Sequence, residues 1–248
     1  VMKSAADHVT RVVLELGGKS PVVVLADCDP ARAFESVVGA IFENAGQICS
    51  AGSRLVIHRS IHDTFVERLA MRANAMTLGH GLRNADLGPV NSAAQLARIA
   101  GHVDRARARG VSVRAGGGIR SDPLTGKGWF YAPTVLADVP LDARIMHEEP
   151  FGPVSPCTAV DSMDEALAIS NSLPMGLAAF VFSNSIATTD YLSKELQVGS
   201  VAVNVFTSPG GDAPFGGNRQ SGIGREGGHE MYHSYTVAKT IAERRVQV

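Results

Sequence analysis

The alternation of apolar, β-branched runs with amphipathic helical patterns is the feature that most restricts the fold of this chain. Residues 22–26 are all Val, Leu or Ala, as in a strand buried on both faces of a parallel sheet. A helical pattern follows, with Asp29 as N-cap, Pro30 in the first turn and Gly46 as the stop. The same alternation predicts strands at 54–58, 111–114, 154–160, 178–182 and 200–205, and helices at 63–76, 92–110, 162–172 and 186–196.

These alternations predict an α/β fold, with a three-layer α/β/α arrangement, a largely parallel sheet and right-handed crossovers. After residue 204 the chain becomes rich in Gly and Pro, and residues 235–248 alternate partly in polarity. We expect this last segment to pair with a sheet edge of its own chain or of a partner. The triple glycine at 116–118 could cradle a phosphate, but the turn residues that follow it favour a surface loop.

The charge of the chain argues against nucleic acid or an anionic membrane as its partner. Lys and Arg total 23 against 24 Asp and Glu, a net charge of -1. No apolar run approaches the roughly 20 residues of a membrane span, and residues 1–8 resemble a helix rather than a signal peptide. We interpret one basic cluster as a solvated face without a binding role: Arg105, Arg107, Arg109 and Arg114.

The three cysteines are an odd and sparse set, which favours a reducing compartment such as the cytoplasm over a disulfide framework. Cys28 lies between two aspartates and Cys157 lies inside a strand pattern, so we assign both to structure. Cys49 is different, because it follows Gly46 in a turn of small residues that leaves room for a substrate at sulfur. The alternative is a half-buried and inert thiol.

Glu15 interrupts an apolar segment, so its carboxylate is expected at the end of a buried element, where burial raises its pKa. The alternatives are a glutamate of an edge strand that faces water and an ion-pair partner of Lys19. A carboxylate that activates water and a thiol that forms an acyl intermediate, as in Glu15 and Cys49, are what the covalent oxidation of an aldehyde to an acid requires.

Four segments occur in an order that resembles the C-terminal catalytic half of the NAD(P)-dependent aldehyde dehydrogenase superfamily. They are LELGGKSP at 14–21, FENAGQIC at 42–49, EEPFGPV at 148–154 and PFGGNRQSGIGRE at 214–226. The likeness covers essentially the whole chain. One departure is Arg219, near where many members have lysine, and we expect it to have little effect.

The resemblance implies that Cys49 is the nucleophile and Glu15 the base. It also implies that Glu149 holds the nicotinamide ribose hydroxyls, with Phe151 packed nearby and Leu16 in the same cofactor site. Chemistry agrees, because a carboxylate accepts hydroxyl groups and an aromatic face suits a nicotinamide ring. Without the family, Glu149 and its neighbour Glu148 would be a solvated acidic pair.

The resemblance further places Ile48, Ser50 and Phe215 in the aldehyde tunnel, whereas Ile48 and Phe215 would otherwise be interpreted as core. We expect Lys19 to support the backbone of its motif rather than to take part in catalysis. We expect no metal in the site.

The resemblance also predicts the organisation of the chain. Residues 1–20 are expected to be the residual edge of a cofactor-binding domain, 21–226 the catalytic domain, and 227–248 an oligomerisation arm. The expected cofactor is NAD or NADP, and the expected partners are a small-molecule aldehyde, a complementing N-terminal half and further copies in a homo-oligomer. Family features outside this chain include the coenzyme loop and an Asn donor to the oxyanion, so we expect the isolated chain to be weak or inactive. Two other possibilities are a non-catalytic interaction module and a residual esterase.

Overall fold

A seven-stranded sheet forms the centre of the computed structural model, which describes residues 1–207 and 210–244. The strand order is β11-β10-β2-β3-β8-β7-β4, and all neighbours are parallel except β4 and β7. The α/β class and the largely parallel sheet are therefore confirmed. The strands are β2 (Ser20–Val24), β3 (Gly52–His58), β4 (Ser112–Ala115), β7 (Thr134–Ala137), β8 (Val154–Val160), β10 (Ala178–Phe182) and β11 (Ser200–Val203).

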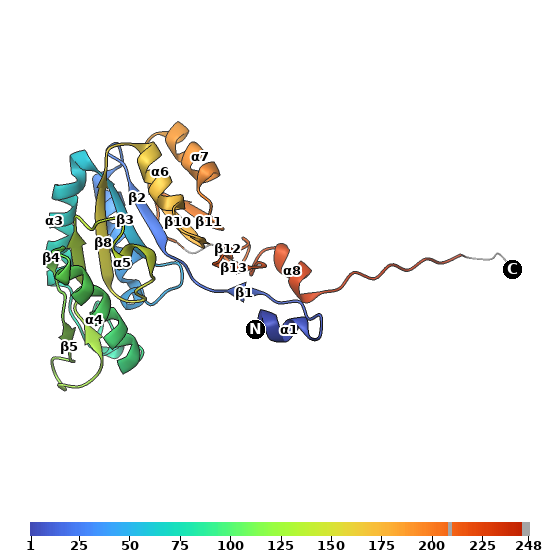
Figure 1. Cartoon of the computed structure of the whole chain (residues 1–248), viewed down its shortest axis with the longest axis horizontal. Helices are drawn as coiled ribbons and strands as arrows, with labels where there is room; N and C mark the ends of the chain where they lie inside the picture. The colour runs from blue at the N-terminus through green and yellow to red at the C-terminus, as the bar shows by residue number, and fades with distance from the viewer. Residues whose placement is uncertain (208–209, 245–248) are drawn as a thin grey trace.

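Helices cover both faces of the sheet, which confirms the three layers (Figure 1). Along β2, Val22 and Val24 pack toward α2 and α3, while Val23 packs toward α6 and α7, as the two-residue period of a strand requires. A further apolar cluster joins α4 and α5 to β7 and β8. The helices are α2 (Pro30–Phe42), α3 (Arg59–Ala75), α4 (Ala93–Ala108), α5 (Arg144–His147), α6 (Met163–Asn171) and α7 (Ile186–Glu195).

Helix caps explain where the expected boundaries hold and where they fail. The Asp29 carboxylate accepts from the amides of Ala31 and Arg32 at 2.9 and 3.1 Å, which confirms it as the N-cap of α2. The third helix begins earlier than its apolar pattern predicts, because Nδ1 of His58 accepts from the amide of Ser60. The expected strands and helices are all present, whereas β7 and α5 were not predicted from the sequence.

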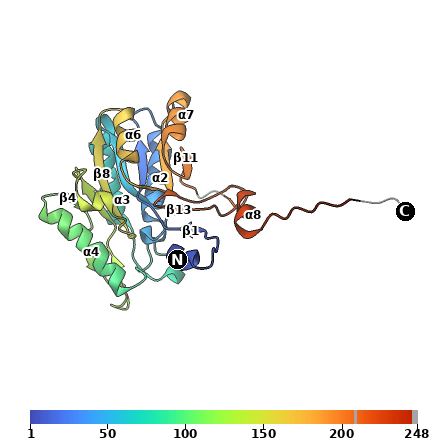
Figure 2. The same cartoon turned by 45° about the vertical axis from the view of Figure 1, so that its right-hand side comes forward.

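Two short strands from opposite parts of the chain, β1 (Leu14–Glu15) and β13 (Gly222–Ile223), lie side by side next to the sheet (Figure 2). Strand β1 pairs antiparallel with β13. The other short elements are α1 (Met2–Ala6), η1 (Glu43–Gly46), η2 (Gly81–Arg83), β5 (Ile119–Arg120), β6 (Phe130–Tyr131), β9 (Met175–Gly176), β12 (Asn218–Arg219) and α8 (Glu230–Tyr235).

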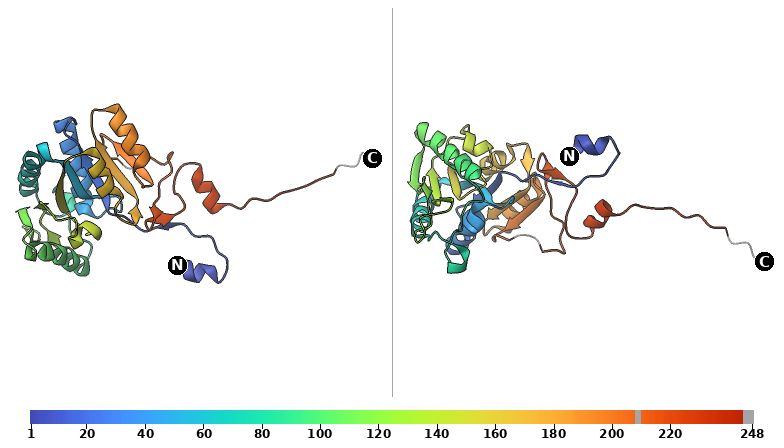
Figure 3. Two further views of the ribbon diagram at one scale, coloured as in Figure 1. Left: turned by 45° about the horizontal axis from the view of Figure 1, so that its top comes forward. Right: turned by 90° about the horizontal axis from the view of Figure 1, so that it is seen from below.

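Beyond α8, residues 236–244 run away from the sheet without forming a strand (Figure 3). The expected pairing of 235–248 with a sheet edge is therefore absent from the described part of that segment, and 245–248 lie outside the described residues. Within residues 1–207 and 210–244, no helix is both long and apolar enough to cross a membrane.

Candidate active site

The candidate residues lie on segments that lead into neighbouring strands. Glu15 and Leu16 precede β2, Cys49 precedes β3, and Glu149 and Phe151 precede β8. Because β2, β3 and β8 are adjacent and parallel, their amino ends lie at one edge of the sheet. The last motif reaches the same edge through the pairing of β13 with β1. The fold therefore brings the four sequence motifs together.

A left-handed turn holds the nucleophile candidate. Asn44 and Ala45 have φ of 50° and 55°, and Gly46 has φ of 69°. A left-handed residue other than glycine costs about 1–2 kcal/mol, so the surrounding contacts must hold this turn in place. Helix α2 therefore ends at Phe42, earlier than the stop expected at Gly46, because Asn44 and Ala45 already have left-handed backbone angles.

Side-chain amides supply those contacts. Nδ2 of Asn44 donates to the carbonyl of Gln47 at 3.1 Å, and Nε2 of Gln47 donates back to the carbonyl of Asn44 at 3.2 Å. Gln47 also donates to the carbonyl of Pro89 and accepts from the amide of Asn91. The turn before Cys49 is thus fixed to the loop ahead of α4.

The Cys49 thiol is half-buried, and burial raises its pKa. Glu149 and Glu15 raise this pKa further, while the backbone amides of Ser50 and Cys49 lower it by hydrogen bonding to sulfur. The thiol therefore stays protonated near neutral pH, and a nucleophilic role requires a base. The two amides are hydrogen-bond donors beside the sulfur.

Glu15 has the properties of such a base. Burial raises its pKa, Glu226 raises it further, and Arg225 opposes both effects. Both carboxylate oxygens are buried without a hydrogen-bond partner in the described residues. A Cβ on Gly216 would lie 2.7 Å from Oε1 of Glu15, so only glycine leaves room for this carboxylate.

Lys19 is not the ion-pair partner of Glu15. Its Nζ donates to the carbonyl of Ser53 at 2.6 Å, and Nε of Arg54 donates to the carbonyl of Lys19 at 2.9 Å. These bonds tie the beginnings of β2 and β3 together, as expected for a residue that supports its motif.

The remaining cysteines have structural environments. Burial and two flanking aspartates raise the pKa of Cys28, and burial raises the pKa of Cys157 to about 12. All three thiols are free in the structure. Cys49 is therefore the best candidate nucleophile among them.

Glu149 is packed against the glycine turn of the first motif. A Cβ on Gly17, whose φ is 76°, would lie 3.0 Å from Oε2 of Glu149. Burial raises the pKa of this carboxyl to about 7, and Lys19, Arg98 and the amide of Gly18 oppose the rise. Glu149 is thus a shielded acceptor rather than a solvated acid, unlike Glu148, which accepts from Nε of Arg144 at 2.6 Å.

Two residues of α4 that the sequence analysis missed hold the Glu149 segment. Nη2 of Arg98 donates to the carbonyl of Glu149 at 3.0 Å. Nε2 of Gln95 donates to the carbonyls of Pro150 and Phe151 at 2.8 and 3.0 Å. As polar residues on an amphipathic helix, they carry no local signal that distinguishes them from a solvated face. Leu16, the third expected cofactor residue, is 60 % exposed.

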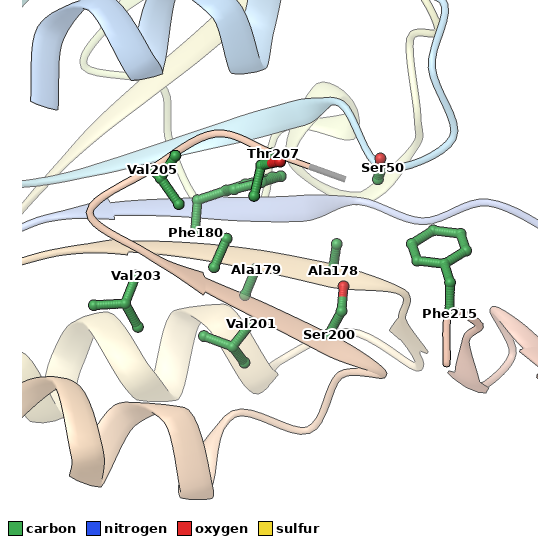
Figure 4. A pocket seen from close by; sticks show the side chains of 11 residues that line it. Ser50, Ala178, Ala179, Phe180, Ser200, Val201, Val203, Val205, Thr207 and Phe215 are labelled. Carbon is green, nitrogen blue, oxygen red and sulfur yellow. The ribbon is translucent and has the colours of Figure 1, made fainter. Parts of the chain in front are cut away.

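Of the three expected tunnel residues, Ser50 and Phe215 line one cavity of about 280 Å³, whereas Ile48 is not among its lining residues. Figure 4 shows these two side chains at one end of the cavity. The rest of the lining is mostly apolar and comes from β10, β11 and the chain after them: Ala178, Ala179, Phe180, Ser200, Val201, Ala202, Val203, Val205 and Thr207.

Comparison with known proteins gives consistent results. The profile of the aldehyde dehydrogenase family matches residues 1–241. A betaine aldehyde dehydrogenase of Bacillus subtilis is 37% identical over 97% of this chain and 49% of its own length. The human mitochondrial aldehyde dehydrogenase is 38% identical over 96% of this chain and 46% of its own length.

Solved structures show the same relationship. Betaine aldehyde dehydrogenase from Staphylococcus aureus in complex with NAD+ superimposes with a TM-score of 0.92 and 38% identity, covering 96% of this chain and 47% of that one. The NAD+ complex of aldehyde dehydrogenase from Bacillus cereus gives a TM-score of 0.91 and 38% identity, with 95% and 48% covered. This chain therefore spans about half the length of the proteins it matches.

Proposed function

Because the chain belongs to the aldehyde dehydrogenase family, we propose that it forms the catalytic part of an enzyme that oxidises an aldehyde to a carboxylic acid. The observation that carries this proposal is the placement of Cys49 and Glu15 at one edge of the sheet. There, each group is shielded enough to have a raised pKa. The proposed cofactor is NAD or NADP, and NAD is the one bound in the related structures named above.

In the proposed reaction, Glu15 accepts the proton of the Cys49 thiol, and Sγ then attacks the aldehyde carbon. We assign the amides of Cys49 and Ser50, which lie beside the sulfur, as donors to the oxygen that becomes negative. A bound nicotinamide supplies the acceptor for the hydride of the resulting thiohemiacetal. Glu15 releases that first proton to solvent, then takes a proton from the water that attacks the Cys49 thioester and passes it to the departing sulfur, which releases the acid and restores the thiol.

The residues present fit part of a nicotinamide cofactor. Glu149 is a shielded carboxylate that can accept ribose hydroxyls, and Phe151 offers an aromatic face on the same segment. Leu16 is exposed beside Glu15, where it can contact a ring. We assign the rest of the cofactor site to a dinucleotide-binding half that this chain does not include.

We propose that the aldehyde occupies the cavity bordered by Ser50 and Phe215. Its apolar lining favours an apolar chain over a charged one. Ile48 stays a candidate on the strength of its position next to Cys49.

Assembly with other copies is a second proposed role. We divide the chain into 1–20, the edge of a cofactor-binding domain, 21–226, the catalytic domain, and 227–248, an arm. Strand β11 pairs only with β10 and leaves an open edge in the described sheet, while 236–244 is extended. These features favour a homo-oligomer, and they would also serve a non-catalytic interaction module. The free thiols support a reducing compartment, for which we propose the cytoplasm.

Acylation by an activated ester tests the nucleophile without any cofactor. With p-nitrophenyl acetate, mass spectrometry is expected to find one acetyl group on Cys49. Cys49→Ala should remove it, and the control Cys28→Ala should not. Glu15→Gln should slow both acylation and deacylation, each by about 10²- to 10⁴-fold, because the same carboxylate serves as the base in both steps. Acylation that persists in Cys49→Ala would refute the assigned nucleophile.

Dehydrogenase activity needs a separate assay. We expect the chain with NAD+ and a panel of aldehydes to form NADH slowly or not at all, because loss of one oxyanion donor costs about 10²- to 10³-fold. Adding the N-terminal half of a relative should raise the rate. If no NADH forms in either case, the proposed oxidation is wrong, and ester hydrolysis alone would identify a residual esterase.

A monomer in sedimentation experiments would contradict the homo-oligomer.

A further inference from the structure

A second cavity, of about 280 Å³, lies between the C-terminal half of α4 and the segment that begins α5. Three arginines line the cavity. Arg105 lies in α4, Arg109 directly follows α4, and Arg144 is the first residue of α5. His102 of α4 lines it as well. None of these residues belongs to the candidate active site.

The four arginines that looked alike in the sequence have different surroundings. Nη1 of Arg107 donates to Asp104 at 2.9 Å, and Nη2 of Arg114 donates to Glu67 at 3.1 Å. These two fit a solvated face. Arg105 and Arg109 instead line a cavity to which a third arginine, Arg144, comes from a distant part of the chain.

Partners within the protein satisfy only some of these cations. Nη2 of Arg109 donates to both carboxylate oxygens of Asp142, at 3.0 and 2.8 Å, and Arg144 pairs with Glu148. Arg105 has no side-chain hydrogen bond or ion pair within residues 1–207 and 210–244. Three arginines thus meet two carboxylates. The pKa of Glu148 is lowered first by Arg144, which hydrogen-bonds to it, and also by Arg105, which makes no side-chain hydrogen bond of its own in the described residues.

His102 adds a buried imidazole with a ring nitrogen that has no hydrogen-bond partner in the described residues. It is 2 % exposed, its Nδ1 has no hydrogen-bond partner in the described residues, and its Nε2 lies 3.9 Å from Oε2 of Glu148. Burial and the nearby Arg105 lower its pKa to about 4, so the ring is neutral and keeps one N–H donor. A buried nitrogen without a partner costs about 1–3 kcal/mol unless a ligand or water satisfies it.

We propose that this cavity binds a compact oxyanion with phosphate chemistry, either inorganic phosphate or the phosphate of a small phosphomonoester. The unpaired fork of Arg105 supplies two parallel donors that match phosphate oxygens. Arg144 lines the same cavity and can exchange Glu148 for the ligand. The volume lies near the lower limit of pockets for small organic molecules, about 300 Å³, which fits a phosphate group with a short substituent.

Calorimetric titration of the whole chain with inorganic phosphate, at constant ionic strength, tests the site. Saturable one-to-one binding is expected, and Arg105→Gln should weaken it at least about 10-fold, as for the loss of a charge-assisted contact. Arg105 is exposed, so this variant should fold, and circular dichroism checks that it does. The matched control is Arg114→Gln, which removes an arginine paired elsewhere and should change the affinity less than 2-fold.

Titrations with glycerol phosphate and with acetate identify the ligand class. Binding of phosphate or glycerol phosphate in preference to acetate supports the proposal, and the tighter of the two phosphates indicates whether the natural ligand is free phosphate or an ester. Absence of saturable binding of both phosphates overturns the proposal. Equal affinities in Arg105→Gln and the parent chain, or acetate binding as tight as phosphate binding, also overturn it.

Discussion

The left-handed turn before Cys49 predicts that one glycine is far less replaceable than another of the same backbone class. Gly46 and Gly110 both have φ in the left-handed region, at 69° and 82°. A Cβ on Gly46 would lie 2.2 Å from the carbonyl oxygen of Gly152 and 3.1 Å from that of Ile41. A Cβ on Gly110 would meet no heavy atom within 4 Å. Alanine at the two positions therefore separates backbone strain from contact.

The expected free energies follow from these surroundings. For Gly110→Ala, left-handed strain of about 1–2 kcal/mol is partly offset by about 0.4–1 kcal/mol of lost unfolded-state entropy, which leaves about 1 kcal/mol of destabilisation. Gly46→Ala has the same terms and also forces two backbone segments apart, which adds about 1–3 kcal/mol. We expect a total of about 2–4 kcal/mol for Gly46→Ala.

Urea unfolding of the parent chain, Gly46→Ala and Gly110→Ala measures how much each substitution lowers the free energy of unfolding. With an m-value of about 3 kcal/mol/M, Gly46→Ala should lower the midpoint by about 1 M and Gly110→Ala by about 0.3 M. The rate at which a thiol reagent labels Cys49 in the folded protein should change only in Gly46→Ala, since Cys28 and Cys157 are buried. Midpoints that agree for the two variants would refute the close contact with Gly152.

Further predictions concern single contacts. Asp29→Ala should lower the free energy of unfolding by about 1 kcal/mol in urea, because two amides at the start of α2 lose their acceptor. The folded-state pKa of His102 is about 4, below the unfolded value of about 6.5, so the unfolded state binds more protons as the pH falls. The parent chain should therefore lose up to about 1.4 kcal/mol per pH unit between pH 6.5 and 4 relative to His102→Gln, and a parallel pH dependence of the two proteins would contradict this. Arg54→Lys should destabilise by more than about 1 kcal/mol, because one ammonium cannot reach the carbonyls of Lys19, Ile169 and Ser170 together, and an unchanged urea midpoint would argue against that network.

Local patterns predicted most of the central sheet. The continuous apolar run at 22–26 and the cap at Asp29 depend on neighbours in the sequence, so period and capping chemistry were enough to identify a buried strand and the helix after it. Strand β7 and helix α5 were missed, because all four residues of β7 are buried and show no alternation, and α5 is a single turn without a side-chain cap. Their stability comes from packing on the rest of the fold.

The site residues that could be predicted are those that stand in recognisable sequence motifs. Glu15 and Cys49 stand in motifs, and each precedes an expected strand, so their meeting at one sheet edge follows from parallel pairing. Gln95 and Arg98 act through carbonyls more than fifty residues along the chain, and no local pattern shows this. The strained conformation of Ala45 likewise depends on contacts made by Gln47 with a distant loop.

The pairing of β1 with β13 has a consequence for how the protein is made. The segment that carries Glu15 pairs with a strand that ends at Ile223, far along the chain. At about 5–20 residues per second, a ribosome needs roughly 10–40 s to make the intervening chain. During synthesis, Glu15 therefore has no partner strand until the residues around 223 have been made.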